Sequence, residues 1–125
     1  MDDKELIKKA KSVLRPKRTR HGSTVGAVGC ALLTYKGNVH TGVCIETCSG
    51  MGLCAEQSAI AAMVVTGEYK IKRIVAVSES GVIAPCGKCR EFIHQIHEDN
   101  LDTEVIIAEN KAVKLRELLP YPWDG

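Results

Sequence analysis

Two short cysteine motifs constrain this chain more than any other feature. The first is Cys54-Ala55-Glu56 and the second is Pro85-Cys86-Gly87-Lys88-Cys89-Arg90. Two cysteines three positions apart at a helix start lie on one turn and can bind one ion together. A third thiol from a second helix start leaves the fourth position of a tetrahedral zinc ion open for water. The motifs therefore predict a zinc centre formed by Cys54, Cys86 and Cys89, with the carboxylate of Glu56 beside it.

Other interpretations of the cysteines stay open at this point. A C-x-x-C pair in an intracellular chain is often a redox pair or half of a structural zinc site. A structural site normally has four protein ligands, and Cys44, Cys48 or one of the four histidines could supply the fourth. A thioredoxin-like pair fits less well, because such motifs usually open the first helix of their fold. The carboxylate of Glu56 argues against a zinc module without catalysis.

The composition is that of an ordinary globular protein. A chain of 125 residues, 45% hydrophobic and 26% charged, is long enough for one domain, residues 1–125, with a core of its own. No apolar run approaches the length of a membrane span. Met1 to Glu5 lacks the apolar segment of a secretory signal, so the six cysteines favour a reducing compartment and a cytoplasmic location. A net charge of +2 and 4% aromatic residues argue against a nucleic-acid partner.

The hydrophobic pattern predicts alternating strands and helices. Helices are expected over residues 3–15, 54–66 and 86–97, with a helical turn at 115–119. Strands are expected at 25–34, 39–45, 74–78 and 105–108, and loops at 17–22, 46–53 and 81–85. This order predicts an α/β fold, a three-layer α/β/α sandwich around a mixed sheet. Both cysteine motifs then lie at helix N-termini, whose partial positive charge stabilises thiolates.

A few other side chains have simpler interpretations. Cys30 is expected in the core and His40 is expected to face solvent. His94 and His97 are more consistent with solvated helix residues than with a metal pair.

Taken together, these segments resemble the cytidine deaminase family, in its small form with a three-cysteine zinc site. The motif with a carboxylate two residues after the first ligand, followed by P-C-x-x-C, is the mark of zinc deaminases. Val28 to Leu33, Gly42 to Thr47 and Leu118-Leu119-Pro120 are similar to further family segments. The ending, Tyr121 to Gly125, is similar to that of blasticidin S deaminases.

The resemblance implies a function and a set of roles. The expected reaction is zinc-dependent hydrolytic deamination of a cytosine-type nucleoside, cytidine, deoxycytidine or a modified cytidine, to the uracil form with release of ammonia. The alternative substrate is a blasticidin S-type aminopyrimidine. Glu56 would move protons, the backbone around Ala55 and Ala84 would bind the pyrimidine edge, and Glu46 would bind a sugar hydroxyl. Trp123 would cover the base from a neighbouring subunit, because the resemblance also implies a homotetramer.

The chain departs from the family pattern near the expected sugar site. Cys44 stands where the family has a ribose-binding Asn, and Thr47 replaces a second Asn. Gln57 stands where many members have Arg, and Arg90 is expected to offset thiolate charge. The segment with Arg18, Arg20 and His21 lacks the family's aromatic-Pro-aromatic run. Because a thiol is a weak donor and acceptor, a modified cytidine stays open as the substrate beside cytidine and deoxycytidine.

Overall fold

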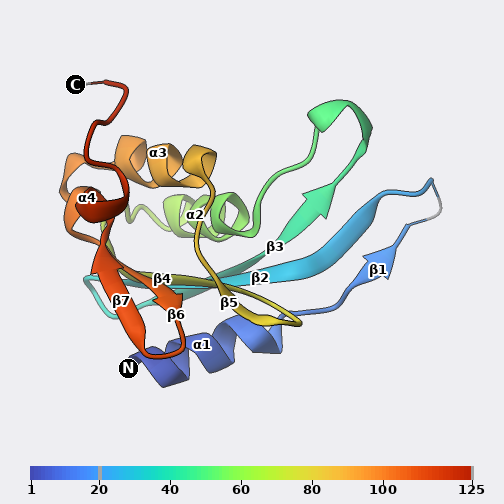
Figure 1. Cartoon of the computed structure of the whole chain (residues 1–125), viewed down its shortest axis with the longest axis horizontal. Coiled ribbons are helices and arrows are strands. Elements are labelled where there is room, and N and C mark those ends of the chain that lie inside the picture. The colour runs from blue at the N-terminus through green and yellow to red at the C-terminus, as the bar shows by residue number, and fades with distance from the viewer. Residues whose placement is uncertain (20, 125) are drawn as a thin grey trace.

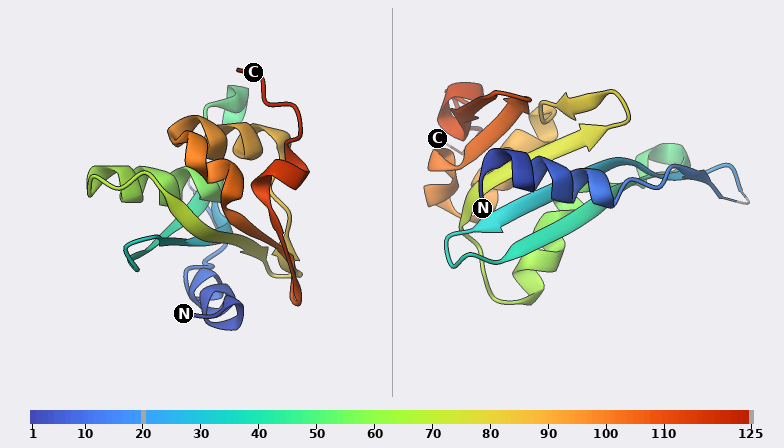
Figure 2. Two further views of the ribbon diagram at one scale, coloured as in Figure 1. Left: turned by 90° about the vertical axis from the view of Figure 1, so that its left-hand side faces the viewer. Right: turned by 90° about the horizontal axis from the view of Figure 1, so that it is seen from below.

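The computed structural model describes residues 1–19 and 21–124, and in it a seven-stranded sheet separates two layers of helices (Figures 1 and 2). The strands are β1 (Lys17–Arg18), β2 (Thr24–Thr34), β3 (Val39–Glu46), β4 (Ile71–Ser78), β5 (Gly81–Ile83), β6 (Glu104–Ala108) and β7 (Lys111–Lys114). The helices are α1 (Asp3–Ser12), α2 (Ala55–Val65), α3 (Gly87–Ile96) and α4 (Leu115–Leu118), with short 3-10 helices η1 (Cys48–Gly50) and η2 (Glu98–Asp102). α1 covers one face of the sheet and the other α-helices cover the opposite face. The three-layer α/β/α sandwich is therefore confirmed.

The sheet is mixed, as expected. Its strand order is β1-β2-β4-β6-β7, with β3 paired to β2 and β5 paired to β4. β2 runs antiparallel to β3 and β4, whereas β4 and β6 are parallel. A parallel pair needs a crossover connection, and α3 lies within the one that joins β4 to β6. This crossover brings the start of α3 beside the start of α2, on the same face of the sheet (Figure 1).

The core consists of two clusters, one on each face of the sheet. Successive side chains of a strand point to opposite faces. In β2, Ala31 and Leu33 therefore pack in the cluster under α1, and Cys30 and Leu32 pack in the cluster under α2 and α3. Cys30 is fully buried, which confirms its interpretation as a core residue.

Helix α2 has clear boundaries but an unusual surface. Cys54 takes an extended conformation at its N-cap, and Gly67 follows the C-cap Thr66 with φ +85°, the left-handed geometry that glycine adopts most easily. The sequence carries no charged residue from position 57 to 67. Four small or apolar side chains of α2 are exposed, and we call them the outer face of α2: Ala61, Ala62, Val64 and Val65. A helix that is apolar all round is normally buried.

The structure corrects several element boundaries. α1 ends at Ser12 rather than at residue 15, because Arg15 donates its backbone N–H to Gly26 at 3.0 Å and so joins the sheet edge. Gly26 has φ +74°, and a Cβ there would lie 2.4 Å from the Arg15 carbonyl oxygen. β4 begins at Ile71, three residues earlier than expected. Three short strands were missed: β1 and β5 lie in segments expected to be loops, and β7 lies between the expected strand at 105–108 and the expected helical turn at 115–119.

The expectation for His40 was wrong. Its side chain is 14% exposed, and its Nε2 lies 3.9 Å from the buried carboxylate of Glu68. The amide of Asn38 donates to the same carboxylate at 2.8 Å.

Two residues lie outside the described part of the chain: Arg20, which belongs to the basic loop expected before β2, and Gly125. Among the residues described, no helix combines the length and apolar character needed to cross a membrane.

Candidate metal centre

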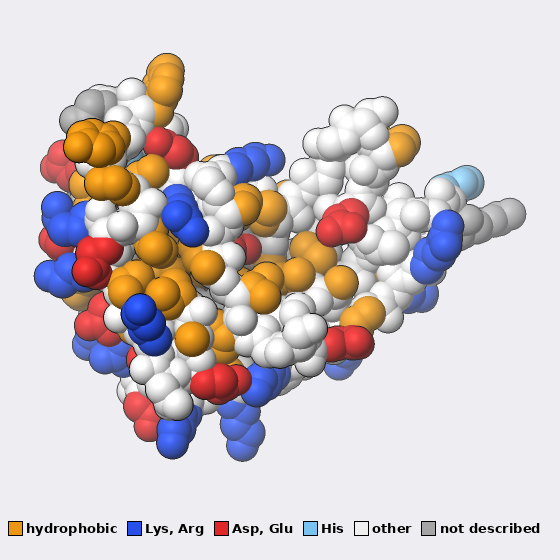
Figure 3. Space-filling model, in the orientation of Figure 1, with side chains coloured by type: hydrophobic (Ala, Val, Ile, Leu, Met, Phe, Trp, Pro, Cys, Tyr) orange, Lys and Arg blue, Asp and Glu red, His pale blue; other side chains and the backbone are white. Residues whose placement is uncertain are grey.

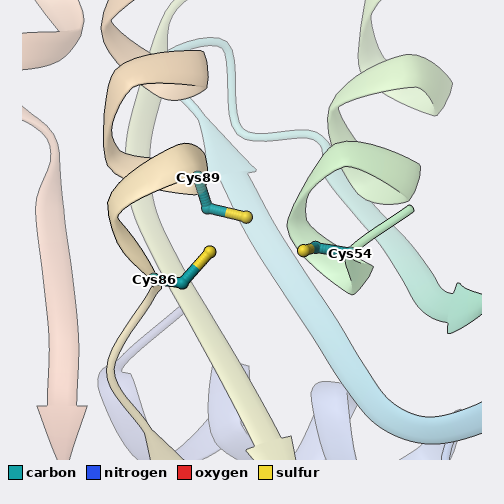
Figure 4. A group of neighbouring side chains, drawn as sticks. All are labelled: Cys54, Cys86 and Cys89. Carbon is teal, nitrogen blue, oxygen red and sulfur yellow. The ribbon is translucent and has the colours of Figure 1, made fainter. Parts of the chain in front are cut away.

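Three thiols meet where α2 and α3 begin. Cys54 is the N-cap of α2, Cys86 is the N-cap of α3, and Cys89 lies in the first turn of α3. Their sulfur atoms all lie within 4.8 Å of one another and point toward a common centre (Figure 4). Within residues 1–19 and 21–124, no other group of three or more His, Cys, Asp or Glu side chains is arranged in this way. A fourth ligand from Cys44, Cys48 or a histidine is therefore not part of the group.

The electrostatics of the thiols suit a soft divalent cation. Burial raises the pKa of the Cys54 and Cys89 thiols, and Cys89 is 1% exposed. Burial acts in the same sense on Cys86, but backbone N–H groups of Cys89 and Lys88 donate to its sulfur and leave the pKa of Cys86 below its ordinary value. Buried thiolates need a positive charge nearby. Three sulfur ligands at this spacing fit zinc, which coordinates cysteine thiolates readily.

Two neighbouring side chains hold the backbone of the motifs in place. The side-chain oxygen of Gln57 accepts the backbone N–H of Cys54 at 3.0 Å. Arg90 donates from Nε to the carbonyl of Pro85 at 2.9 Å, and from Nη1 to the carbonyl of Leu118 at 3.2 Å. Arg90 was expected to offset thiolate charge, and its two hydrogen bonds run to carbonyl oxygens. Gln57 and Arg90 thus act on the loops that carry the cysteines.

A pocket of about 480 Å³ opens beside the thiols. One wall comes from the starts of α2 and α3, and the other from the end of β3 and the loop that follows it; Figure 3 shows the notch between these parts of the surface. Glu56, in the first turn of α2, lines the pocket and is only 6% exposed. Burial raises the pKa of Glu56, and its own backbone N–H offsets part of that effect. The pocket therefore combines a metal-binding group with a carboxylate that has little access to bulk water.

Most of the expected binding residues line this pocket. Cys44, Glu46, Ala55 and Ala84 all do so, as does Thr47. The Cys44 sulfur accepts the backbone N–H of Val28 at 3.3 Å, so it takes part in a strand contact. The carboxylate of Glu46 accepts the hydroxyl of Thr24 at 3.2 Å, which orients it.

Trp123 lies elsewhere. It does not line the pocket, its side chain is 84% exposed, and its backbone N–H donates to Glu91 at 2.7 Å.

The histidine on α3 and the histidine that follows the helix both have hydrogen-bond partners. His94 Nε2 lies 2.8 Å from Asp124, and His97 Nδ1 accepts the backbone N–H of Asp99. His94 is buried rather than solvated, but the two histidines do not form a metal pair.

Sequence reasoning missed Lys88 and three residues of the loop after β3. Lys88 lines the pocket from the first turn of α3. Gly50, Gly52 and Leu53 line it from the loop. A Cβ at Gly52 would lie 2.0 Å from the carbonyl oxygen of Ile45, so only glycine allows this loop to pair back on β3. The position of Lys88 inside the C-x-x-C motif was the available signal.

Comparisons with known proteins agree with this geometry. Residues 1–106 match the family model of the cytidine and deoxycytidylate deaminase zinc-binding region. The chain is 43% identical over 68 residues to a probable cytidine deaminase of Dictyostelium discoideum. The aligned region covers 52% of this chain and 46% of that relative. It is 36% identical over 109 residues to the blasticidin-S deaminase of Bacillus cereus, with 77% and 76% covered. The chain thus spans about half the length of the cytidine deaminases that it matches among curated proteins.

Solved structures are similar over almost the whole chain. Cytidine deaminase from Mycobacterium leprae has a TM-score of 0.80 at 26% identity and covers 97% of this chain and 99% of its own. Cytidine deaminase from Burkholderia pseudomallei has a TM-score of 0.80 at 28% identity, with 98% and 100% covered. The fold, the three grouped cysteines and the match over residues 1–106 lead to one conclusion: the chain belongs to the cytidine and deoxycytidylate deaminase family of zinc-binding proteins.

Proposed function

We propose that this protein is a zinc-dependent hydrolase that converts a cytosine-type nucleoside to its uracil form and releases ammonia. One observation carries the proposal: Cys54, Cys86 and Cys89 converge at one end of a pocket that also contains the buried carboxylate of Glu56. Several relatives and structural neighbours are named cytidine deaminases. The proposal treats residues 1–125 as a single deaminase domain.

Each residue of the site has a defined task. Bound by the three cysteines, zinc would lower the pKa of a water molecule so that hydroxide forms near neutral pH. The carboxylate of Glu56 would take one proton from the attacking water and give it to ring N3, and it would then carry the second proton of the same water to the amino group that leaves. The pyrimidine loses its 4-amino group as ammonia and gains a carbonyl from the water. Because Glu56 is buried, its proton exchanges with the substrate rather than with bulk solvent.

The substrate is positioned by the two walls of the pocket. The backbone around Ala55 and Ala84 holds the pyrimidine edge, and both residues line the pocket next to the cysteines. Glu46, on the opposite wall and oriented by Thr24, accepts a sugar hydroxyl. The buried thiol of Cys44 lies beside it and offers little to a second hydroxyl. These features support a nucleoside with a modified sugar as well as cytidine itself.

We propose a homotetramer in which Trp123 closes the site of a neighbouring subunit. Trp123 does not line the pocket of its own chain, and Tyr121 beside it is 91% exposed. The outer face of α2 is a second apolar surface without a cover. Burial of such surfaces between copies is favourable at about 25 cal/mol per Å². The six free cysteines support a reducing, cytoplasmic location.

A second candidate substrate is an aminopyrimidine antibiotic of the blasticidin S type. The match to the blasticidin-S deaminase of Bacillus cereus covers 76% of that protein. In addition, Cys44 departs from the usual sugar contact. The reaction and the residues that perform it would be the same. The two candidates differ only in what the far end of the pocket binds.

The decisive experiment measures ammonia release by the zinc-loaded protein. The substrates are cytidine, deoxycytidine, modified cytidines, free cytosine and blasticidin S, and Glu56→Gln with confirmed zinc content is the matched control. We expect turnover of at least one nucleoside by the native protein and loss of it in the variant. Absence of turnover for every compound, with one zinc bound per chain, would overturn the proposal.

A further inference from the structure

Lys88 is the one basic residue among the described residues that line the pocket. The charged groups around it in the lining are the carboxylates of Glu46 and Glu56. Glu56 is buried at the metal end, whereas Lys88 is exposed at the start of α3. The pocket is therefore acidic in its depth and basic at one side of its mouth.

No carboxylate of residues 1–19 or 21–124 forms an ion pair with Lys88. Other cations of this chain do have such partners: Lys70 lies 3.2 Å from Asp99, and Arg116 lies 2.8 Å from Asp102. Glu46, the acid of the opposite wall, accepts a hydrogen bond from Thr24. The positive charge of Lys88 is thus available to a molecule in the pocket.

The metal site does not explain the side chain of Lys88. What Lys88 gives to Cys86 is its backbone N–H, and every residue except proline can supply that group. Lys88 is exposed, so its ammonium does not supply the positive charge that the buried thiolate of Cys89 needs. Its place in the pocket lining therefore concerns what the pocket binds.

We propose that Lys88 is a specificity-determining residue that binds an anionic group, carboxylate or phosphate, on the sugar portion of a cytosine compound. The proposal rests on the proposed function, which places the ring at the metal end and the sugar toward the mouth. Glu46 then receives hydroxyl groups on one wall, and Lys88 receives the anion on the other. The partial positive charge at the N-terminus of α3 adds to the attraction.

The test compares charged and neutral substrates that are otherwise matched. Zinc-loaded wild type, Lys88→Met, Lys88→Arg and Lys88→Glu are assayed with cytidine, cytidine 5′-monophosphate and the 5′-carboxylate of cytidine. The readout is the ratio of kcat/KM for the anion to kcat/KM for cytidine. We expect this ratio to fall about tenfold in Lys88→Met, to fall further in Lys88→Glu, and to be largely kept in Lys88→Arg. Lys8→Met, which removes an exposed charge from α1 on the far side of the sheet, should leave the ratio unchanged.

Further arms separate the possible sources of the effect. The anion whose ratio depends more strongly on Lys88 identifies carboxylate or phosphate as the preferred group. Added salt should raise KM for the anions more than for cytidine, because the contact is exposed and screened. An equal loss of activity for all three substrates together with lost zinc would assign Lys88 to the metal site and overturn the proposal.

Binding without turnover keeps this test independent of the deaminase assignment. Titration calorimetry of uridine and uridine 5′-monophosphate measures the same preference on product-like ligands. If no cytosine compound is deaminated but the monophosphate binds about tenfold more tightly than uridine only when Lys88 is present, the proposed function fails and Lys88 keeps its role. If cytidine is deaminated and the ratios are the same in wild type and Lys88→Met, the proposal for Lys88 is wrong.

Discussion

Arg90 ties the loop before Cys86 to the end of α4, because it donates to the carbonyl of Pro85 at 2.9 Å and to that of Leu118 at 3.2 Å. Two distant parts of the chain thus support one edge of the metal centre. A lysine ammonium cannot donate hydrogen bonds in the two fixed directions that the planar guanidinium group offers. We therefore propose that Arg90 is a positioning residue for Cys86.

Replacement of Arg90 by Ala or Lys should weaken zinc binding while the fold survives. The two carbonyls lose a charged donor, which costs about 1–3 kcal/mol for a partly buried group. Competition with a chromophoric chelator measures the zinc affinity, and the cobalt-substituted spectrum reports whether the sulfur geometry changes. The matched control is Arg116→Ala on α4, which removes an exposed ion pair with Asp102 of η2. Equal chelator competition in all variants would show that the contacts of Arg90 do not reach the metal.

Purified protein should contain one zinc per chain with three sulfur ligands. The prediction follows from the grouping of Cys54, Cys86 and Cys89 within 4.8 Å. X-ray absorption at the zinc edge counts the sulfur atoms, and metal analysis gives the stoichiometry. Removal of zinc should lower the midpoint of thermal unfolding, because binding to the folded state alone stabilises it. A shell of four sulfur atoms would contradict a catalytic site.

Glu56→Gln should keep zinc and fold but lose turnover by about two orders of magnitude or more, the usual scale of general acid–base catalysis. The amide has the same size and cannot carry the proton. Metal analysis and circular dichroism check that the site is intact. Near-normal turnover in the variant would assign the proton transfers to another group.

Glu46→Ala should raise KM for substrates that have ribose hydroxyls by about tenfold, which equals about 1.4 kcal/mol. Thr24→Val removes only the hydroxyl that orients Glu46 and should act in the same direction with a smaller effect. Cys44→Asn should improve cytidine relative to other substrates. An unchanged order of substrates in all three variants would mean that the end of β3 does not contact the sugar.

Deletion of residues 121–125 should raise KM strongly, leave zinc in place and reduce the oligomer. Trp123 is the only tryptophan, so its fluorescence should also change when wild type binds a substrate analogue. Light scattering reports the size of the assembly. Unchanged kinetics and size after deletion would remove Trp123 from the site.

The fold was largely predictable where hydrophobic side chains repeat at a regular spacing. The strands around Cys30 and Val105 and the helices after Cys54 and Cys86 follow from such patterns. These two short strands were not predictable, because Lys17–Arg18 is wholly charged, Lys111–Lys114 begins and ends with lysine, and both gain their place from pairing with a neighbour. His40 shows the same limit: its burial depends on Glu68, which lies 28 residues later in the sequence.

The centre of the site was predictable for a different reason. Ligand spacing within one helix turn is a local property, so Cys86 and Cys89 could be paired from sequence alone. The contacts of Arg90 and the exposure of Trp123 depend on how the last segment of the chain packs on α3. Lys88 was overlooked because its neighbours in the motif had an evident role.

The closeness of the three sulfur atoms has a consequence for the handling of the protein. Once the metal is stripped, thiols that lie within 4.8 Å of each other need only a small movement to form a disulfide in air, with oxygen as the electron acceptor. The oxidised pair has no thiolate left for a cation. Activity lost on aerobic storage in a chelating buffer should therefore return with a reductant and zinc together, and with neither alone.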